Sequence, residues 1–150
     1  MAYRTSAGGQ YGCPRCLRNL TSYLVGGFEV DACLTCGGLF IDNAASQELV
    51  RAFDRELVVL ATTLGFGKGE ALGPGVVLRN LSCPRCSAGL HPVTLPSAAV
   101  EIDVCAYDGT WFDANELPKV ARAYRRAREG RPTDMAKDTL GEIFEGRFRG

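Results

Sequence analysis

The sequence lacks several features that would place the protein in familiar functional classes. It has no run of about 18 apolar residues, which a transmembrane helix requires. Its 17 basic and 17 acidic side chains cancel, whereas a dedicated nucleic-acid-binding protein usually carries a clear positive excess. The chain begins Met1-Ala2-Tyr3-Arg4, without the apolar segment of a secretory signal. We therefore expect a cytoplasmic protein that does not enter a membrane.

Histidine is almost absent, but seven cysteines among 150 residues form a pattern that occurs twice. The first copy has Cys13-Pro14-Arg15-Cys16, then sixteen residues, then Cys33-Leu34-Thr35-Cys36. The second has Cys83-Pro84-Arg85-Cys86, then eighteen residues, then Cys105-Ala106-Tyr107-Asp108. Two CxxC pairs that bracket a loop of this length are typical of a four-cysteine zinc ribbon.

The first copy predicts a complete zinc site. A CPxC turn places two thiolates on one side of a tight loop, and a second such turn completes a tetrahedron around the ion. A disulfide framework is the alternative, but no feature of the sequence indicates an oxidising compartment. A redox CxxC of the thioredoxin kind explains one pair and not two pairs in register. We predict that zinc binds Cys13, Cys16, Cys33 and Cys36.

The second copy predicts an altered site, because Asp108 stands where Cys36 closes the first. Three outcomes are open: zinc bound by Cys83, Cys86, Cys105 and Asp108, zinc bound by the three cysteines and water, or no zinc. The single histidine, His91, lies on an extended segment beyond easy reach of the site. An open three-ligand zinc can activate water, but the sequence offers no general base beside it. We predict a second zinc with Asp108 as fourth ligand, no small-molecule substrate and no enzymatic activity.

The repeat extends beyond the metal ligands. Residues 30–33 match residues 102–105, as a short strand that leads into the second CxxC position of each copy. Residues 37–40 match residues 109–112 without a gap, and an aspartate follows each. We expect the large apolar pairs in these segments to pack over the metal sites and the aspartates to cap the following helices. The apolar pairs are Leu39 with Phe40 and Trp111 with Phe112, and the aspartates are Asp42 and Asp113.

These motifs resemble those of bacterial proteins with a TFIIB-type zinc-ribbon, or transcription factor zinc-finger, domain. The resemblance covers about residues 11–53 and about residues 81–123. It implies a zinc-ribbon fold with bound zinc, and the name implies a role in transcription that it does not establish. A variant of the family has histidine where Asp108 stands, so aspartate is a departure from the family pattern.

The fold class that we predict is small α+β, with two tandem zinc-ribbon β-hairpin units each followed by an amphipathic α-helix. The first helix is expected to be about 20 residues long after Asp42, and the second to start near Asn115. The predicted parts are ribbon 1 with its helix (1–64), a glycine-rich hinge (65–75), ribbon 2 with a basic helix (76–131) and an amphipathic segment (132–150). A strand is expected over Val76–Leu81.

The apolar faces of the helices suggest a partner. The first helix has more apolar surface than one ribbon covers, so it packs either on the other half of the chain or on a second protein. We expect a non-enzymatic adaptor that binds another protein or itself. The alternative is a nucleic-acid-associated regulator that uses a basic helix, and a third, minor one is redox or metal sensing through the second site. The basic residues expected to contact nucleic acid or an acidic partner surface are Lys119, Arg122, Arg125, Arg126, Arg128 and Arg131.

Overall fold

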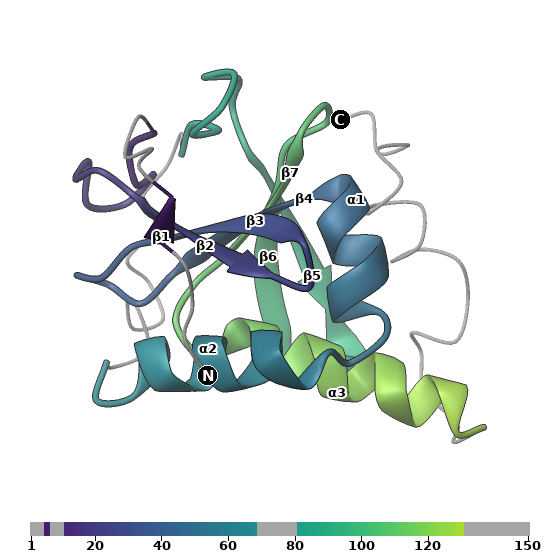
Figure 1. Cartoon of the computed structure of the whole chain (residues 1–150). Helices are drawn as coiled ribbons and strands as arrows, with labels where there is room; N and C mark the ends of the chain where they lie inside the picture. Colours follow the sequence, from purple (N-terminus) through teal and green to yellow (C-terminus); the bar gives the residue numbers. More distant parts are fainter. Residues whose placement is uncertain (1–4, 7–10, 69–80, 131–150) are drawn as a thin grey trace.

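A computed structural model describes residues 5–6, 11–68 and 81–130. Within them the chain forms one antiparallel sheet of seven strands, in the order β1-β2-β3-β4-β7-β6-β5 (Figure 1). In chain order the elements are β1 (Thr5–Ser6), β2 (Thr21–Val25), β3 (Phe28–Ala32), β4 (Leu39–Asp42), α1 (Asn43–Ala45), a π-helical segment η1 (Ser46–Val50), α2 (Arg55–Gly65), β5 (His91–Leu95), a 3₁₀ turn η2 (Pro96–Ala98), β6 (Val100–Val104), β7 (Gly109–Phe112) and α3 (Glu116–Arg128).

The two ribbons join into this single sheet through the pairing of β4 with β7. Leu39 lies opposite Phe112, and Phe40 lies opposite Trp111. Since Leu39 and Phe40 correspond to Trp111 and Phe112 in the repeat, this register relates the two ribbons by a pseudo-twofold axis. The close approach of the strands requires Gly109, because a Cβ at that position would lie 2.2 Å from the carbonyl oxygen of Ile41. The duplicated units therefore form one folded body within the described residues.

The two faces of the sheet bury different clusters, because successive side chains of a strand point to opposite faces. Leu39 and Ile41 belong to the larger core, together with the buried residues of the helices. Phe40 and Trp111 belong to a second cluster that includes cysteines of both copies. One face of the sheet thus carries the helices, and the other carries the cysteine sites.

The apolar stripes of the helices are buried inside the molecule. Helices α2 and α3 contact each other beneath the sheet (Figure 1), and their apolar residues face the larger core. The buried residues of these two helices include Leu57, Leu60, Ala61, Leu117, Val120 and Ala121. Of the two alternatives, packing on the other half of the chain is therefore the one observed, and within the described residues these apolar stripes belong to the core.

The prediction of one helix of about 20 residues after Asp42 is wrong. The chain forms α1 and η1, turns, and begins α2 at Arg55. Phe53 has a φ of 54°, a left-handed conformation that interrupts a helix. Asp54 then starts α2, since its side chain accepts a hydrogen bond from the Leu57 amide at 3.0 Å. The apolar periodicity continues across the break because Phe53 still packs against the core.

The second predicted helix begins where expected, with Asn115 as the residue before α3. Gly130, with a φ of 76°, follows its end. The predicted strand Val76–Leu81 lies outside the described residues except for Leu81, as do most of the glycine-rich hinge and the segment 132–150. The first residue of the predicted hinge, Gly65, belongs to α2. No helix in the described parts of the chain is long and apolar enough to cross a membrane.

Candidate metal centres

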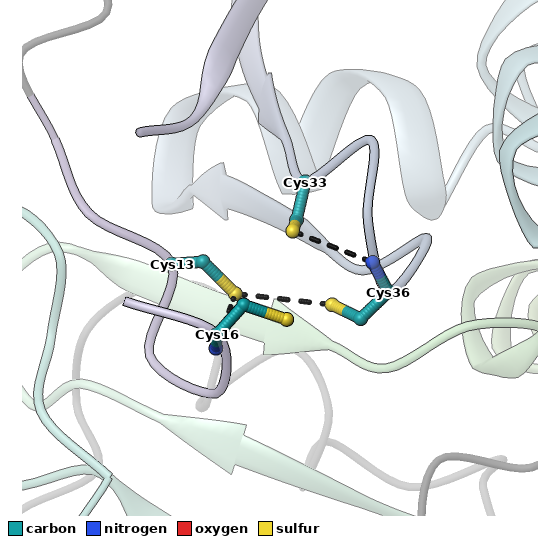
Figure 2. Close-up of side chains that lie close together, drawn as sticks. All are labelled: Cys13, Cys16, Cys33 and Cys36. Carbon is teal, nitrogen blue, oxygen red and sulfur yellow. Dashed lines mark hydrogen bonds between the residues drawn. The ribbon is translucent and has the colours of Figure 1, made fainter. Parts of the chain in front are cut away.

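The first cysteine site is built from two tight turns that meet on the face of the sheet opposite the helices. One turn holds Cys13 and Cys16, and the other, between β3 and β4, holds Cys33 and Cys36 (Figure 2). All four sulfur atoms lie within 4.8 Å of one another, and those of Cys13 and Cys36 are 3.8 Å apart. Zinc bound tetrahedrally by sulfurs at about 2.3 Å requires a sulfur–sulfur separation of about 3.8 Å, whereas a disulfide requires about 2.05 Å. The predicted residues therefore come together with the spacing of a zinc site and not of a disulfide.

Backbone amides of the turns point at the sulfurs. The amides of Arg15 and Cys16 donate to Cys13 Sγ at 3.4 and 3.3 Å, and the Cys36 amide donates to Cys33 Sγ at 3.4 Å. Hydrogen bonds of this kind favour the charged thiolate, which is the form that binds metal. The turns thus provide part of the compensation that four neighbouring negative charges require.

In the absence of metal, two thiols of this site, those of Cys16 and Cys36, resist ionisation. Burial and the neighbouring Cys36 raise the pKa of Cys16 to about 11. The pKa of Cys36 is also raised, first by its hydrogen bond with Cys13 and then by burial. A divalent cation reverses this balance, because it displaces the protons and neutralises the thiolates. The site is therefore suited to a resident zinc ion and not to a reactive cysteine.

The second site has the predicted ligand set, with Asp108 in place of a fourth cysteine. Cys83, Cys86, Cys105 and Asp108 each offer one ligand atom, and these atoms lie within 4.8 Å of one another. The sulfurs of Cys86 and Cys105 are 3.6 Å apart, and Asp108 Oδ2 lies 3.5 Å from Cys83 Sγ and 3.6 Å from Cys105 Sγ. Tetrahedral zinc with sulfur at about 2.3 Å and oxygen at about 2.1 Å requires a sulfur–oxygen distance of about 3.6 Å. The residues therefore fit zinc bound by three thiolates and one carboxylate, and His91, in β5, is not part of the group.

We predict that Asp108→Cys strengthens metal binding at the second site. Thiolate is a better partner than carboxylate for zinc, so the variant is expected to hold zinc at least tenfold more tightly there. The measurement is competition with a chromogenic chelator, in which the wild-type protein loses its second zinc first and the variant does not. As a control, Asp108→Asn keeps the shape of the side chain but removes its charge and is expected to lose zinc sooner than wild type. If neither substitution changed how readily the second site releases zinc, residue 108 would not be a ligand.

Phe40 and Trp111 lie in the apolar cluster that separates the two sites. Both side chains are fully buried, and cysteines of both sites belong to the same cluster. The expectation that both large residues of each pair pack over the metal site is only half right. Leu39 and Phe112 face the helices instead, because neighbouring residues in a strand point to opposite faces.

Asp42 caps the following helix as predicted, but Asp113 does not. Asp42 Oδ1 accepts a hydrogen bond from the Ala45 amide at 2.8 Å. Asp113 instead accepts one from Trp111 Nε1 at 2.9 Å and binds Arg15 through both carboxylate oxygens. Sequence reasoning missed this ion pair between the ribbons. Its signal was present, since an arginine recurs inside CPRC and an aspartate recurs after the apolar pair in both copies.

Glu116, at the start of α3, lies beside this ion pair and carries a perturbed carboxyl group. Burial, followed by the negative charge of Asp113, raises its pKa from an ordinary 4.5 to about 8. The folded protein therefore retains a proton that the unfolded chain releases, so the free energy of unfolding falls as the pH rises from about 4.5 to about 8. Burial also raises the pKa of Asp103, to about 6. This carboxyl group therefore lowers the free energy of unfolding in the same way, over a lower pH range.

We predict that Glu116→Gln makes the protein less sensitive to alkaline pH. Glutamine keeps an oxygen that accepts the Asp113 amide, a bond of 2.8 Å in the wild type, and carries no charge. Urea midpoints measured between about pH 6 and pH 9 are expected to fall for the wild type and to stay nearly constant for the variant. Glu129→Gln, at an exposed position, is the control and should follow the wild-type curve. Parallel curves for wild type and Glu116→Gln would disprove the assignment.

Several of the basic residues predicted for α3 form hydrogen bonds or ion pairs with other residues of the chain. Arg125 pairs with Glu129 at 3.3 Å, and Arg126 and Arg128 donate to the carbonyl oxygens of Ser97 and Ala52 at 3.3 and 3.5 Å. Lys119 also takes part in an interaction, Arg122 is exposed, and Arg131 lies outside the described residues. Three of these arginines therefore have partners within the described part of the chain.

Comparison with known protein families gives one match, which occurs twice in the chain. The family model described as a transcription factor zinc-finger, of the TFIIB zinc-ribbon type, matches residues 12–54 and 82–123. The two segments cover more than half of the chain, and each contains one of the sites described above. Searches of curated proteins and of solved structures found no match.

Proposed function

Because the chain belongs to the TFIIB-type zinc-ribbon family, we propose that it is a non-enzymatic interaction module in which structural zinc presents apolar side chains to another protein. Each ligand set supplies four donors, which completes the tetrahedron of a structural site and leaves no position for substrate. We accordingly assign the protein no catalytic role. The zinc ions serve to hold the turns in shape.

The observation that carries the proposal is the exposure of large apolar side chains on the metal-binding turns. Leu17, which follows Cys16, is 85% exposed, and Leu34, between Cys33 and Cys36, is 54% exposed. At the second site, Tyr107 is 70% exposed. The apolar stripes of α2 and α3, in contrast, are used by the core. The metal-binding turns therefore offer exposed apolar side chains in both ribbons, whereas at α2 the described residues that do so are Val59 and, at its end, Phe66.

The backbone at Leu17 strengthens this argument. Its φ is 60°, and Ser87, at the same position of the second copy, has a φ of 65°. The turn therefore requires a left-handed residue, which glycine or asparagine adopts at lower cost than leucine. Leucine at this position contributes an exposed apolar side chain despite that cost, which favours a role in binding over a role in folding.

The nucleic-acid alternative has less support. The formal net charge is zero, and three of the arginines of α3 already bind groups within the molecule. A surface that follows a phosphate backbone needs several free cations side by side. The family description suggests transcription, and a ribbon that contacts a protein of the transcription apparatus satisfies both that description and this surface.

The test is photo-crosslinking from the metal-binding turn in cells that express the protein. A photoreactive amino acid at position 34 is expected to form a reproducible crosslink to one protein, and Leu17→Asn in the same chain is expected to abolish it. The control carries the photoreactive group at Thr63, an exposed position on α2, and should give no such product. A crosslink that persists after Leu17→Asn, or equal products from both positions, would contradict the proposal. Binding of random DNA that weakens steeply with salt would favour the alternative.

A further inference from the structure

The two arginines of the CPRC turns cross between the ribbons. Arg15 lies between ligands of the first site, but its guanidinium binds residues of the second ribbon. Its Nη2 is 2.7 Å from Asp113 Oδ2 and 3.9 Å from Asp103 Oδ2, and its Nε binds the other oxygen of Asp113. Arg85, between ligands of the second site, reaches the first ribbon in the same way. Its Nη2 is 3.4 Å from Asp31 Oδ2, and its Nη1 is 3.5 Å from Asp42 Oδ2.

Two of these aspartates, Asp31 and Asp103, stand on the strands that lead into metal ligands. Asp31 precedes Cys33 by two residues on β3, and Asp103 precedes Cys105 by two residues on β6. Their strand neighbours belong to the core under the helices, so the carboxylates face the side of the sheet that carries the cysteine sites. Each arginine therefore connects the turn of one metal site with the strand that leads into the other metal site.

Removal of either arginine is costly because the carboxylates that it contacts are shielded from water. Asp31 is 1% exposed, and Asp103 and Asp113 are each 8% exposed. A buried carboxylate that loses its cationic partner remains as an uncompensated charge. The position of each arginine depends on the CPRC turn that contains it, because the backbone amides of Arg15 and Arg85 both donate to a ligand sulfur at 3.4 Å. A metal ion that fixes one turn thereby places the cation that the other ribbon requires.

We propose that Arg15 and Arg85 are positioning residues that couple the two metal sites, each acting mainly on the site of the opposite ribbon. Binding of zinc at either site then raises the affinity of the other, and thermodynamic linkage makes this effect reciprocal. The inference rests on the proposed structural zinc at both sites.

The two arginines do not contribute equally to the coupling, and the stronger contacts are those of Arg15. Arg15 binds Asp113 through two charge-assisted hydrogen bonds, whereas Arg85 makes longer contacts, and its buried Nε has no hydrogen-bond partner among the described residues. The stronger contact thus reaches the ribbon with the weaker ligand set, which contains Asp108. We conclude that the second site depends on the first ribbon more than the first depends on the second.

The test is Co²⁺ binding to the full chain, in which a tetrathiolate site and a site with three thiolates and one carboxylate absorb at different visible wavelengths. Arg15→Gln is expected to weaken Co²⁺ binding at the second site about tenfold while the first site changes much less. Arg15→Lys, which keeps the charge but not the two-point contact, should fall between this variant and the wild type. Arg18→Gln, at an exposed position of the same loop, should leave both sites unchanged.

Several results would overturn the coupling. One is a loss of Co²⁺ affinity confined to the first site, which would show that Arg15 acts only on the turn that contains it. Equal losses at both sites would indicate general destabilisation, and no change at either site would remove the role altogether. If Arg15→Gln does not fold, Arg15→Lys gives the same comparison. A wild-type protein that binds Co²⁺ at one site only would instead disprove the proposed two-zinc function, and this outcome is distinguishable from the others.

Discussion

Cys16→Ala is expected to abolish the cooperative fold at room temperature. The apparent binding free energy of structural zinc in small domains is about 10–16 kcal/mol, which is comparable with the whole net stability of a domain, about 5–15 kcal/mol. Loss of one of the four thiolates weakens metal binding, and without the ion the two turns that carry the other three cysteines are no longer linked. Circular dichroism during heating should show no sharp transition for the variant and a sharp one for the zinc-loaded wild type.

The matched control is Cys86→Ala, the equivalent position in the second copy. Cys86 is exposed, and its site already contains one weaker ligand, so this variant is expected to retain the fold with a lower melting temperature. A Cys16→Ala protein that melts at the wild-type temperature would show that zinc at the first site is not structural. If Cys86→Ala lowered the melting temperature more than Cys16→Ala did, the second site would contribute more to stability than the first, which is the opposite of what we expect.

Trp111→Ala is expected to have the second large effect, a loss of about 3–5 kcal/mol in the free energy of unfolding. The indole is completely buried between the two metal sites and donates to Asp113 at 2.9 Å. Its ring lies directly against Gly38 of the other ribbon, where an added Cβ would be 2.1 Å from Trp111 Cζ2. Gly38→Ala is therefore expected to destabilise the protein as well, because the indole has to move.

The double variant shows whether the two residues act through this one contact. With the indole removed, an alanine at position 38 no longer collides with it, so Gly38→Ala with Trp111→Ala should cost less than the sum of the single variants. The measurement is urea unfolding followed by circular dichroism, because the substitution removes the only tryptophan. As a control, Gly89→Ala adds a Cβ that meets nothing within 4 Å and should change stability little. Strictly additive costs at positions 38 and 111 would contradict the described packing.

The ligands were predictable because metal binding leaves a local signature. CxxC spacing brings sulfurs together through a few backbone bonds, so the sequence alone indicates both ligand sets, including Asp108 at the fourth position of the second. The strands that lead into Cys33 and Cys105 were predictable for the same reason, because the repeat aligns them residue by residue.

The arrangement of the ribbons was not predictable, because it depends on contacts between distant residues. The pairing of β4 with β7 joins Leu39 to Phe112, and the ion pair joins Arg15 to Asp113, which are 98 positions apart. The repeat shows that these residues recur in both copies, but it does not show which of them meet. Hydrophobic periodicity also did not reveal the break before α2. Phe53 keeps its place in the apolar pattern while its backbone leaves the helix, and Asp54 is equally suited to an exposed helical face and to a cap.

Both sets of four ligands are expected to hold zinc in one folded chain. Native mass spectrometry of the purified protein tests this expectation most directly, with the thiols kept reduced and the metal identified by elemental analysis. We predict a mass that corresponds to two zinc ions per chain, and to one zinc ion after mild chelation that empties the site with Asp108 first. A native mass with a single zinc ion before chelation, or with none, would show that the two ligand sets do not both hold zinc.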